Sequence, residues 1–244
     1  MESASRRLGK TVIDVEHLQR QLGDRCLINN FTYSFSPEDR VGFIGPNGMG
    51  KSTLLDLLSG RQQPDAGSVV RGETVVIGRF DQHSEDLKPE LKVIEVIQDV
   101  AERIDLGQGN SLTASQLLER FLFPPAQQHS PVAKLSGGER RRLHLCRLLM
   151  AAPNVLLLDE PTNDLDVETL RALEDAIMAF PGSAMVISHD RWFLDRIATH
   201  ILAYEDDGNV VFHEGNYSEY EEDRRSRLGN AADVPSRIKH RKLM

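Results

Sequence analysis

An eight-residue segment, Gly45–Ser52 (GPNGMGKS), constrains the fold of this chain more than any other stretch. It matches the pattern G-x-x-x-x-G-K-[ST], follows the apolar run VGFI, and leads into a predicted helix over Lys51–Ser59 that Gly60 ends. Glycines allow successive backbone N–H groups to turn toward an anion, and a helix N-terminus adds a positive dipole end. The order strand, glycine loop, helix therefore predicts a phosphate-binding unit.

Side chains in this segment add their own chemistry. Lys51 can reach the β- and γ-phosphates of a nucleotide, and the Ser52 hydroxyl can ligate Mg²⁺. At ordinary glycine usage, about one chain in a hundred of this length would carry the pattern by accident, and the flanking strand and helix weaken that alternative further. The residues predicted to contact the nucleotide are Gly45, Pro46, Asn47, Gly48, Gly50, Lys51, Ser52 and Thr53.

A pair of carboxylates follows a second apolar run, VLLLDEP. Asp159 ends the predicted strand, where a carboxylate can hold Mg²⁺ or its water, and Glu160 comes next. On an extended strand Glu160 points away from Asp159, which leaves it free to polarise an attacking water. The alternative is an acidic pair that merely ends a strand at the surface.

A second glycine-rich segment, LSGGE, opens a predicted helix over Glu139–Ala151 with Leu143, Cys146, Leu149 and Met150 as its buried stripe. The free N–H groups at its start, with Ser136, Gly137 and Gly138, form a second candidate anion site. Taken alone, the segment would be an ordinary helix N-terminus.

The remaining pattern indicates an α/β protein. Apolar strands NVLLLD and AMVISH alternate with helices, which is typical of a parallel sheet covered on both faces. Residues 83–134 are charged and favour helix, with amphipathic segments over 91–104 and 114–123, and are interpreted as an inserted helical subdomain. A β-hairpin is expected around Asp207-Gly208. We expect one domain over residues 1–228 and a basic tail over 229–244.

Bulk properties exclude some classes. A net charge of -8 argues against a general nucleic-acid coat, although a local basic patch stays compatible with it. No apolar run is long enough to span a membrane, and the N-terminus lacks a signal-peptide core. A cytoplasmic location, no membrane contact, and reduced thiols at Cys26 and Cys146 are expected.

The phosphate loop, Gln82 in RFDQH, the LSGGE loop, the DEP strand end and His189 in ISHD occur in an order that resembles ATP-binding cassette (ABC) domains over nearly the whole chain. The resemblance implies a P-loop NTPase fold of the ABC nucleotide-binding type, with a mixed β-sheet core, an antiparallel β subdomain and an inserted α-helical subdomain. ATP and Mg²⁺ are the implied ligands.

The resemblance also implies roles for individual residues. Ser52, Gln82 and Asp159 are the expected metal contacts, Gln82 and Glu160 face the attacking water, and His189 hydrogen-bonds the γ-phosphate. In a head-to-tail pair of cassettes, Ser136 to Gly138 of one domain close the ATP held by the other.

Two positions depart from the family pattern. Leu22 stands where many cassettes place an aromatic residue that stacks on adenine, so we expect modest base selectivity and weaker nucleotide binding. Met49 replaces a more usual small residue in the loop, with no expected loss of activity because its backbone still faces the phosphate.

The segments PTNDLD, SHDRWFLD and EGNYSEYEE resemble the ABC-F subfamily, whose members carry two cassettes in one chain and bind ribosomes or act in DNA-linked stress responses. From PTNDLDVETL to the basic tail, the chain is similar to C-terminal cassettes of a translation-regulating branch, whereas QLLERFLFPPAQQHSPVAKLSGGERRRL in the middle looks more like the Uup branch. A mosaic of the two branches, natural or engineered, is an open alternative.

The implied partners are a second cassette, either another copy of this chain or an N-terminal cassette of which this chain is the separated counterpart, and the ribosome with its rRNA and tRNA. Basic residues of the tail could contact RNA phosphates or could be a solvated end: Arg237, Lys239, His240, Arg241 and Lys242.

Three functions compete. The first is a Mg²⁺-dependent ATPase of paired cassettes, and the second is a nucleotide-binding half-site with little turnover. The third is the motor subunit of a transporter, which PTNDLD and SHDRWFLD disfavour.

Overall fold

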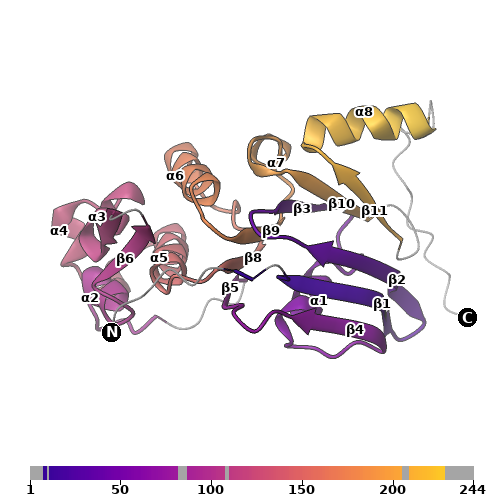
Figure 1. Cartoon of the computed structure of the whole chain (residues 1–244). Coiled ribbons are helices and arrows are strands. Elements are labelled where there is room, and N and C mark those ends of the chain that lie inside the picture. The colour runs from indigo at the N-terminus through magenta and orange to yellow at the C-terminus, as the bar shows by residue number, and fades with distance from the viewer. Residues whose placement is uncertain (1–7, 10, 82–86, 108–109, 205–208, 229–244) are drawn as a thin grey trace, which may run out of the picture.

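The structure is a computed structural model that describes residues 8–9, 11–81, 87–107, 110–204 and 209–228 (Figure 1). The strands are β1 (Ile13–Leu22), β2 (Arg25–Phe35), β3 (Arg40–Ile44), β4 (Ala66–Arg71), β5 (Ile77–Phe80), β6 (Arg103–Gly107), β7 (Asn110–Thr113), β8 (Val155–Asp159), β9 (Ser183–Ile187), β10 (His200–Tyr204) and β11 (Val210–Glu214). The helices are α1 (Lys51–Ser59), α2 (Val93–Gln98), α3 (Ala114–Arg120), α4 (Pro125–Gln128), α5 (Gly137–Met150), α6 (Val167–Met178), α7 (Arg191–Ile197) and α8 (Tyr217–Leu228), with a 3₁₀ turn, η1, at Val132–Lys134.

A six-stranded sheet in the order β11-β10-β3-β9-β8-β5 forms the centre of the fold. Its strands run parallel except β11, which pairs antiparallel with β10. The predicted mixed α/β fold is confirmed. Helix α1 follows β3, and helix α6 follows β8. Because these two strands run parallel, the phosphate loop after β3 and the acidic residues at the end of β8 lie at the same edge of the sheet.

The alternation of side chains along β8 divides the interior into two cores. Leu156 and Leu158 face a core built with α5, α6 and α7, whereas Val155 and Leu157 face a core built with α1 and the antiparallel strands. Figure 1 shows the same layers, with α6 and α7 on one side of the sheet and α1 on the other. Burial on both faces explains why the predicted strand NVLLLD is continuously apolar.

A separate antiparallel sheet, in the order β2-β1-β4, packs beside α1 and confirms the predicted antiparallel subdomain. Its pairing shifts register near His17, whose φ is 49°. Bulges of this kind increase the local twist of a hairpin. The β1–β2 turn lies beside the phosphate loop, where Arg25 Nη2 is 3.0 Å from Met49 Sδ.

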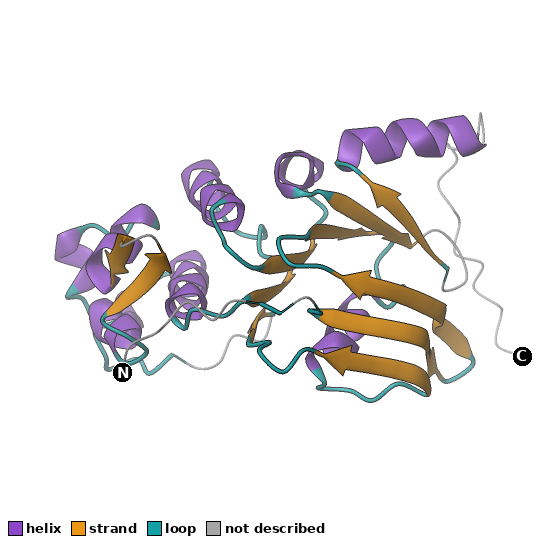
Figure 2. Cartoon of the chain, viewed as in Figure 1, coloured by secondary structure: helices purple, strands orange, loops and turns teal. Residues whose placement is uncertain are grey.

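The predicted helix over 91–104 is wrong in its second half. Helix α2 ends at Gln98, and the following residues form β6, which pairs antiparallel with β7. Figure 2 shows this hairpin among the helices. Ile104 pairs with Leu112, and both side chains are buried in the core that the helices share, so packing overrides the local helical pattern. The predicted helix over 114–123 stops earlier, since α3 ends at Arg120 and Leu122 has φ 60°.

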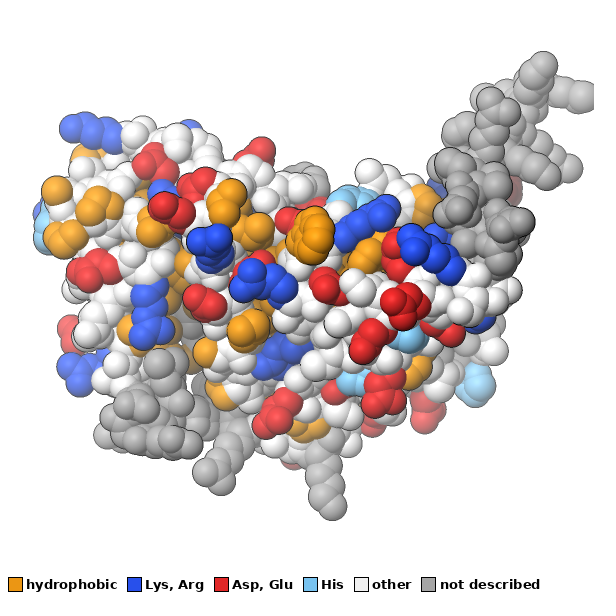
Figure 3. Space-filling model, turned by 90° about the horizontal axis from the view of Figure 1, so that it is seen from above, with side chains coloured by type: hydrophobic (Ala, Val, Ile, Leu, Met, Phe, Trp, Pro, Cys, Tyr) orange, Lys and Arg blue, Asp and Glu red, His pale blue; other side chains and the backbone are white. Residues whose placement is uncertain are grey.

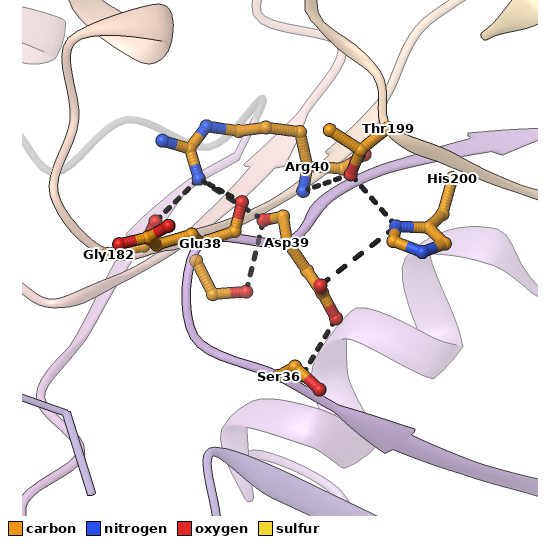
Figure 4. Close-up of polar contacts among 8 residues, drawn as sticks. Ser36, Glu38, Asp39, Arg40, Gly182, Thr199 and His200 are labelled. Atoms are coloured by element: carbon orange, nitrogen blue, oxygen red, sulfur yellow. Dashed lines mark hydrogen bonds and ion pairs between the residues drawn. The ribbon is translucent and has the colours of Figure 1, made fainter. Parts of the chain in front are cut away.

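A buried arginine joins the starts of three strands, on the sheet edge away from the phosphate loop (Figure 4). Arg40 Nε donates to Ile177 O at 3.0 Å, and its Nη1 donates to Gly182 O at 2.6 Å. Its backbone N–H donates to Thr199 Oγ1 at 3.0 Å, and that hydroxyl lies 2.8 Å from His200 Nδ1. The network fixes β3, β9 and β10 relative to one another.

Cys26 and Cys146 are free thiols, as expected. Among the described residues, no helix combines the length and apolar character that a membrane crossing requires. The strands of the predicted β-hairpin are β10 and β11, but its turn at Asp207-Gly208 lies outside the described residues.

Candidate nucleotide site

The loop between β3 and α1 depends on its glycines. Gly45, Gly48 and Gly50 have φ values of 137°, 74° and 102°, in the left-handed region that suits glycine. A Cβ at Gly45 would lie 2.7 Å from Tyr204 Cβ, and one at Gly50 would lie 3.0 Å from Leu27 Cβ. The backbone conformation and the packing therefore both exclude larger residues at these two positions.

Lys51 begins α1 and is buried under the loop. Its Nζ donates to Gly45 O at 2.6 Å and to Pro46 O at 2.9 Å, so the ammonium lies inside the cradle that a phosphate would share. Burial lowers the pKa of Lys51, and the nearby Glu160 and Asp159 carboxylates act in the opposite direction. Ser52 is exposed and Thr53 is half-buried in the next positions of α1.

The acidic pair differs from the prediction in one respect. Asp159 is buried at the end of β8, but Glu160 has φ 49° and lies beyond the strand, so the extended geometry predicted for it is wrong. Its N–H donates to Ile187 O at 2.9 Å, and the Arg141 guanidinium donates to its carbonyl oxygen. The turn directs the Glu160 side chain toward His189.

His189 follows β9, which pairs with β8 as expected. Its Nε2 lies 3.4 Å from Glu160 Oε1 and 2.7 Å from Asn47 Oδ1 of the phosphate loop. The His189 side chain is 54% exposed and that of Glu160 only 9%. The structure thus brings the loop, the glutamate and the histidine together at the carboxyl ends of three neighbouring strands.

One carboxylate oxygen of Glu160 is available to accept a hydrogen bond. Its Oε2 is buried and has no hydrogen-bond partner within the described part of the chain. Burial raises the pKa of Glu160, while His189 opposes that change. A buried, unsatisfied acceptor beside an anion cradle fits a water placed for attack on a phosphate.

The oxygen-bearing side chains near the phosphate loop also fit a nucleotide bound with Mg²⁺. Among the described residues, no cluster of three or more His, Cys, Asp or Glu side chains could hold a metal by itself. Mg²⁺ in nucleotide sites takes few protein ligands and shares the phosphates, which matches one hydroxyl, Ser52, and one carboxylate, Asp159. Gln82, the third predicted contact, lies outside the described residues, and Asp81 just before it pairs with Arg61 at 2.5 Å.

The signature loop is organised around its own helix. Ser136 caps α5, its Oγ accepting from Glu139 N at 3.3 Å, and Glu139 Oε2 accepts from Ser136 N at 2.7 Å. A Cβ built at Gly137 would meet no described atom within 4 Å, and one at Gly138 would lie 3.2 Å from Asp164 O. The described contacts do not join Ser136, Gly137 or Gly138 to the phosphate loop of the same chain.

Sequence reasoning missed two arginines. Arg141 donates to the Glu160 carbonyl, as described above, and no motif in the sequence indicates this contact. Arg25 pairs with Leu22 across the β1–β2 turn, and its Nη2 lies 3.0 Å from Met49 Sδ on the rim of the loop. Leu22 itself is 67% exposed there.

Comparison with known proteins identifies a family for the chain. Residues 28–163 match the family described as ABC transporter. The chain is 53% identical over 237 residues to the energy-dependent translational throttle protein EttA of Haemophilus influenzae, an alignment that covers 97% of this chain and 42% of that protein. It is 48% identical over 232 residues to the uncharacterized ABC transporter ATP-binding protein YfmR of Bacillus subtilis, covering 95% of this chain and 37% of that one.

Solved structures give the same fold at lower identity. An ATP-binding subunit of an ABC transporter has a TM-score of 0.67 at 18% identity, covering 92% of this chain and 95% of that one. A dimeric ATP-binding cassette in a post-hydrolysis state with ADP and phosphate has a TM-score of 0.65 at 20% identity, covering 83% and 98%.

The chain spans less than half the length of its curated relatives. No comparison tests a mosaic origin, which stays a hypothesis. Because the family model matches more than half of its residues, this chain belongs to the ATP-binding cassette family, and it is similar to the ABC-F protein EttA.

Proposed function

We propose that this chain is a Mg²⁺-dependent ATPase cassette that completes its catalytic cycle when two cassettes close head to tail. The observation that carries the proposal is the buried Glu160 carboxylate, which has one oxygen toward His189 and one without a described partner, beside a formed phosphate loop. This carboxylate lies beside the histidine that contacts the phosphate loop, which supports a role in placing the attacking water.

The residues divide into those that bind and those that react. Lys51 and the loop N–H groups bind the phosphates, and Ser52, Asp159 and Gln82 would hold Mg²⁺, which neutralises phosphate charge and orients the γ-phosphate when bound. Burial keeps the Glu160 pKa raised, which makes the carboxylate a better acceptor for a proton from water. His189 donates to the γ-phosphate and holds it near that water.

The need for a second cassette is supported by the signature loop. Gly137 is open to solvent on the side where a Cβ would stand, so no described contact within the chain explains a glycine there. A nucleotide held by a neighbouring cassette would explain it, because its phosphate needs close approach to the N–H groups at the start of α5. A structural neighbour of this chain is described as a dimeric cassette.

A role in regulating translation in the cytoplasm is proposed from the relatives, several of which are named energy-dependent translational throttle proteins. On the face shown in Figure 3, acidic and basic side chains of the described residues are interspersed and form no single basic patch. Ribosomal RNA contact is proposed for the tail, residues 229–244, because its sequence carries several basic residues; the tail lies outside the described residues. Truncation at Pro235 should weaken ribosome association, and unchanged association would refute this assignment.

Hydrolysis measured against protein concentration tests the proposal. A homodimerising ATPase gains specific activity as it is concentrated, because each site needs the signature loop of another copy. A nucleotide-binding half-site, the second candidate, binds ATP but shows low activity at every concentration until its partner cassette is added. Activity that is high and independent of concentration would contradict the paired mechanism.

A further inference from the structure

Arg141 occupies a position that none of the expected site motifs explains. It lies in the second turn of α5, and its guanidinium donates through Nη2 to the backbone carbonyl of Glu160. The same guanidinium lies over the Phe80 ring, 5.2 Å from the ring centroid. Phe80 ends β5 and is fully buried, two residues before Gln82.

The carbonyl that Arg141 contacts belongs to Glu160, whose backbone conformation is unfavourable without stabilising contacts. Glu160 has φ 49°, an uncommon region for a residue other than glycine that persists when surrounding contacts maintain it. Two such contacts are present, the bond from Glu160 N to Ile187 O at 2.9 Å and the bond from Arg141 to Glu160 O. One holds the amide end of the residue and the other holds the carbonyl end.

Neighbouring arginines in α5 have different contacts. Arg142 Nη1 donates to Thr169 Oγ1 at 2.9 Å and its guanidinium lies 4.8 Å from the Phe123 ring centroid, so it joins α5 to α6 and the inserted helices. Arg140 is exposed. Of the three, Arg141 is the one whose described contacts reach the acidic strand end.

We propose that Arg141 is a positioning residue, which holds the Glu160 backbone in its turned conformation and ties it to the helix that carries the signature loop. This rests on the proposed function of Glu160. Ser136 caps α5 and Arg141 lies five positions later in that helix. A nucleotide bound at the signature loop therefore contacts the same helix that positions Glu160, which belongs to the other ATP site. Arg141 would thereby link closure of one site to readiness of its neighbour.

The test compares Arg141→Met with Arg140→Met in the complete chain. Methionine keeps an apolar stem against Phe80 but cannot donate to the carbonyl. We expect Arg141→Met to lower kcat by about 10²-fold, the size of effect that a small misplacement of a catalytic group produces, with the Kd for ATP unchanged. Arg141→Lys keeps a donor and should recover part of kcat, and Arg140→Met should match wild type.

Hydrogen exchange gives a readout that does not require turnover. A peptide spanning residues 155–163 should exchange faster in Arg141→Met than in Arg140→Met, with no change in peptides from β10 or α8. Exchange that rises throughout the chain would indicate a purely structural role and overturn the proposal, as would wild-type kcat in Arg141→Met. If wild type does not hydrolyse ATP at any concentration, with or without a partner cassette, the proposed function fails, and the exchange of residues 155–163 still decides whether Arg141 holds Glu160.

Discussion

His189 Nε2 lies 2.7 Å from the side-chain oxygen of Asn47, although the two residues are 142 positions apart in the chain. The contact joins the loop after β9 to the phosphate loop and leaves Glu160 Oε1 3.4 Å from the same nitrogen. One imidazole therefore bridges the residues that bind phosphate and the residue that faces the attacking water.

Replacing His189 by Ala should lower kcat by about 10²- to 10³-fold, because it removes one donor aimed at charge that develops on the γ-phosphate. Binding of ATP should change little, since Lys51 and the loop N–H groups remain. Steady-state hydrolysis and nucleotide titration measure the two effects separately. His129→Ala, an exposed histidine in the inserted helices, is the matched control. Hydrolysis at the wild-type rate in His189→Ala would remove the histidine from the mechanism.

The sequence predicts the elements around the site well because their signals are local. The glycine spacing, the apolar run before Asp159 and the Ser136 cap each lie within one short segment. The turn at Glu160 was not predictable, because its left-handed backbone depends on partners from β9 and α5. The prediction of a helix where β6 forms was wrong for a similar reason. The pairing of Ile104 with Leu112 and the burial of both side chains override the local helical preference.

The exposed Leu22 predicts weak discrimination between bases. Wild type should bind ATP and GTP with similar Kd, whereas Leu22→Tyr should tighten ATP binding by about 5- to 150-fold, the equivalent of roughly 1–3 kcal/mol of base stacking. Titration of both nucleotides against wild type, Leu22→Tyr and Leu22→Ala measures this, with the alanine variant as the control for loss of the side chain. A strong preference of wild type for ATP would show that another residue supplies base contacts.

Burial of Glu160 predicts a pH-dependent gain in stability from Glu160→Gln. Because the pKa is raised in the folded state, the contribution of this carboxyl to stability is present below its unfolded pKa, about 4.3, and is lost as pH rises through the folded pKa. Glutamine does not ionise, so the variant should have a higher Tm than wild type at pH 7 and the same Tm near pH 4. Thermal denaturation without nucleotide at both pH values checks this. A lower Tm for the variant at pH 7 would contradict the burial argument.

The Arg40 network predicts a large effect on stability without a direct effect on chemistry. Arg40→Met leaves the carbonyls of Ile177 and Gly182 without their donor and should lower the free energy of unfolding by about 2–4 kcal/mol. Arg20→Met breaks a surface pair with Asp65 and should cost only about 0–1 kcal/mol. Denaturant unfolding of the two variants measures the difference. Equal losses would mean that the buried network does not fix the strands.

Sedimentation of Glu160→Gln with Mg²⁺ and ATP tests whether two cassettes close on shared ATP sites. Loss of the carboxylate should slow hydrolysis by about 10²- to 10⁴-fold and trap the closed state. We expect a species of 27.4 kDa without nucleotide and of twice that mass with ATP, either as a homodimer or, when a partner cassette is supplied, as a heterodimer. Introducing Gly137→Asp as well should abolish the doubling while ATP still binds. A single-cassette mass at saturating ATP, with and without a partner cassette, would show that the cassettes do not close as a pair.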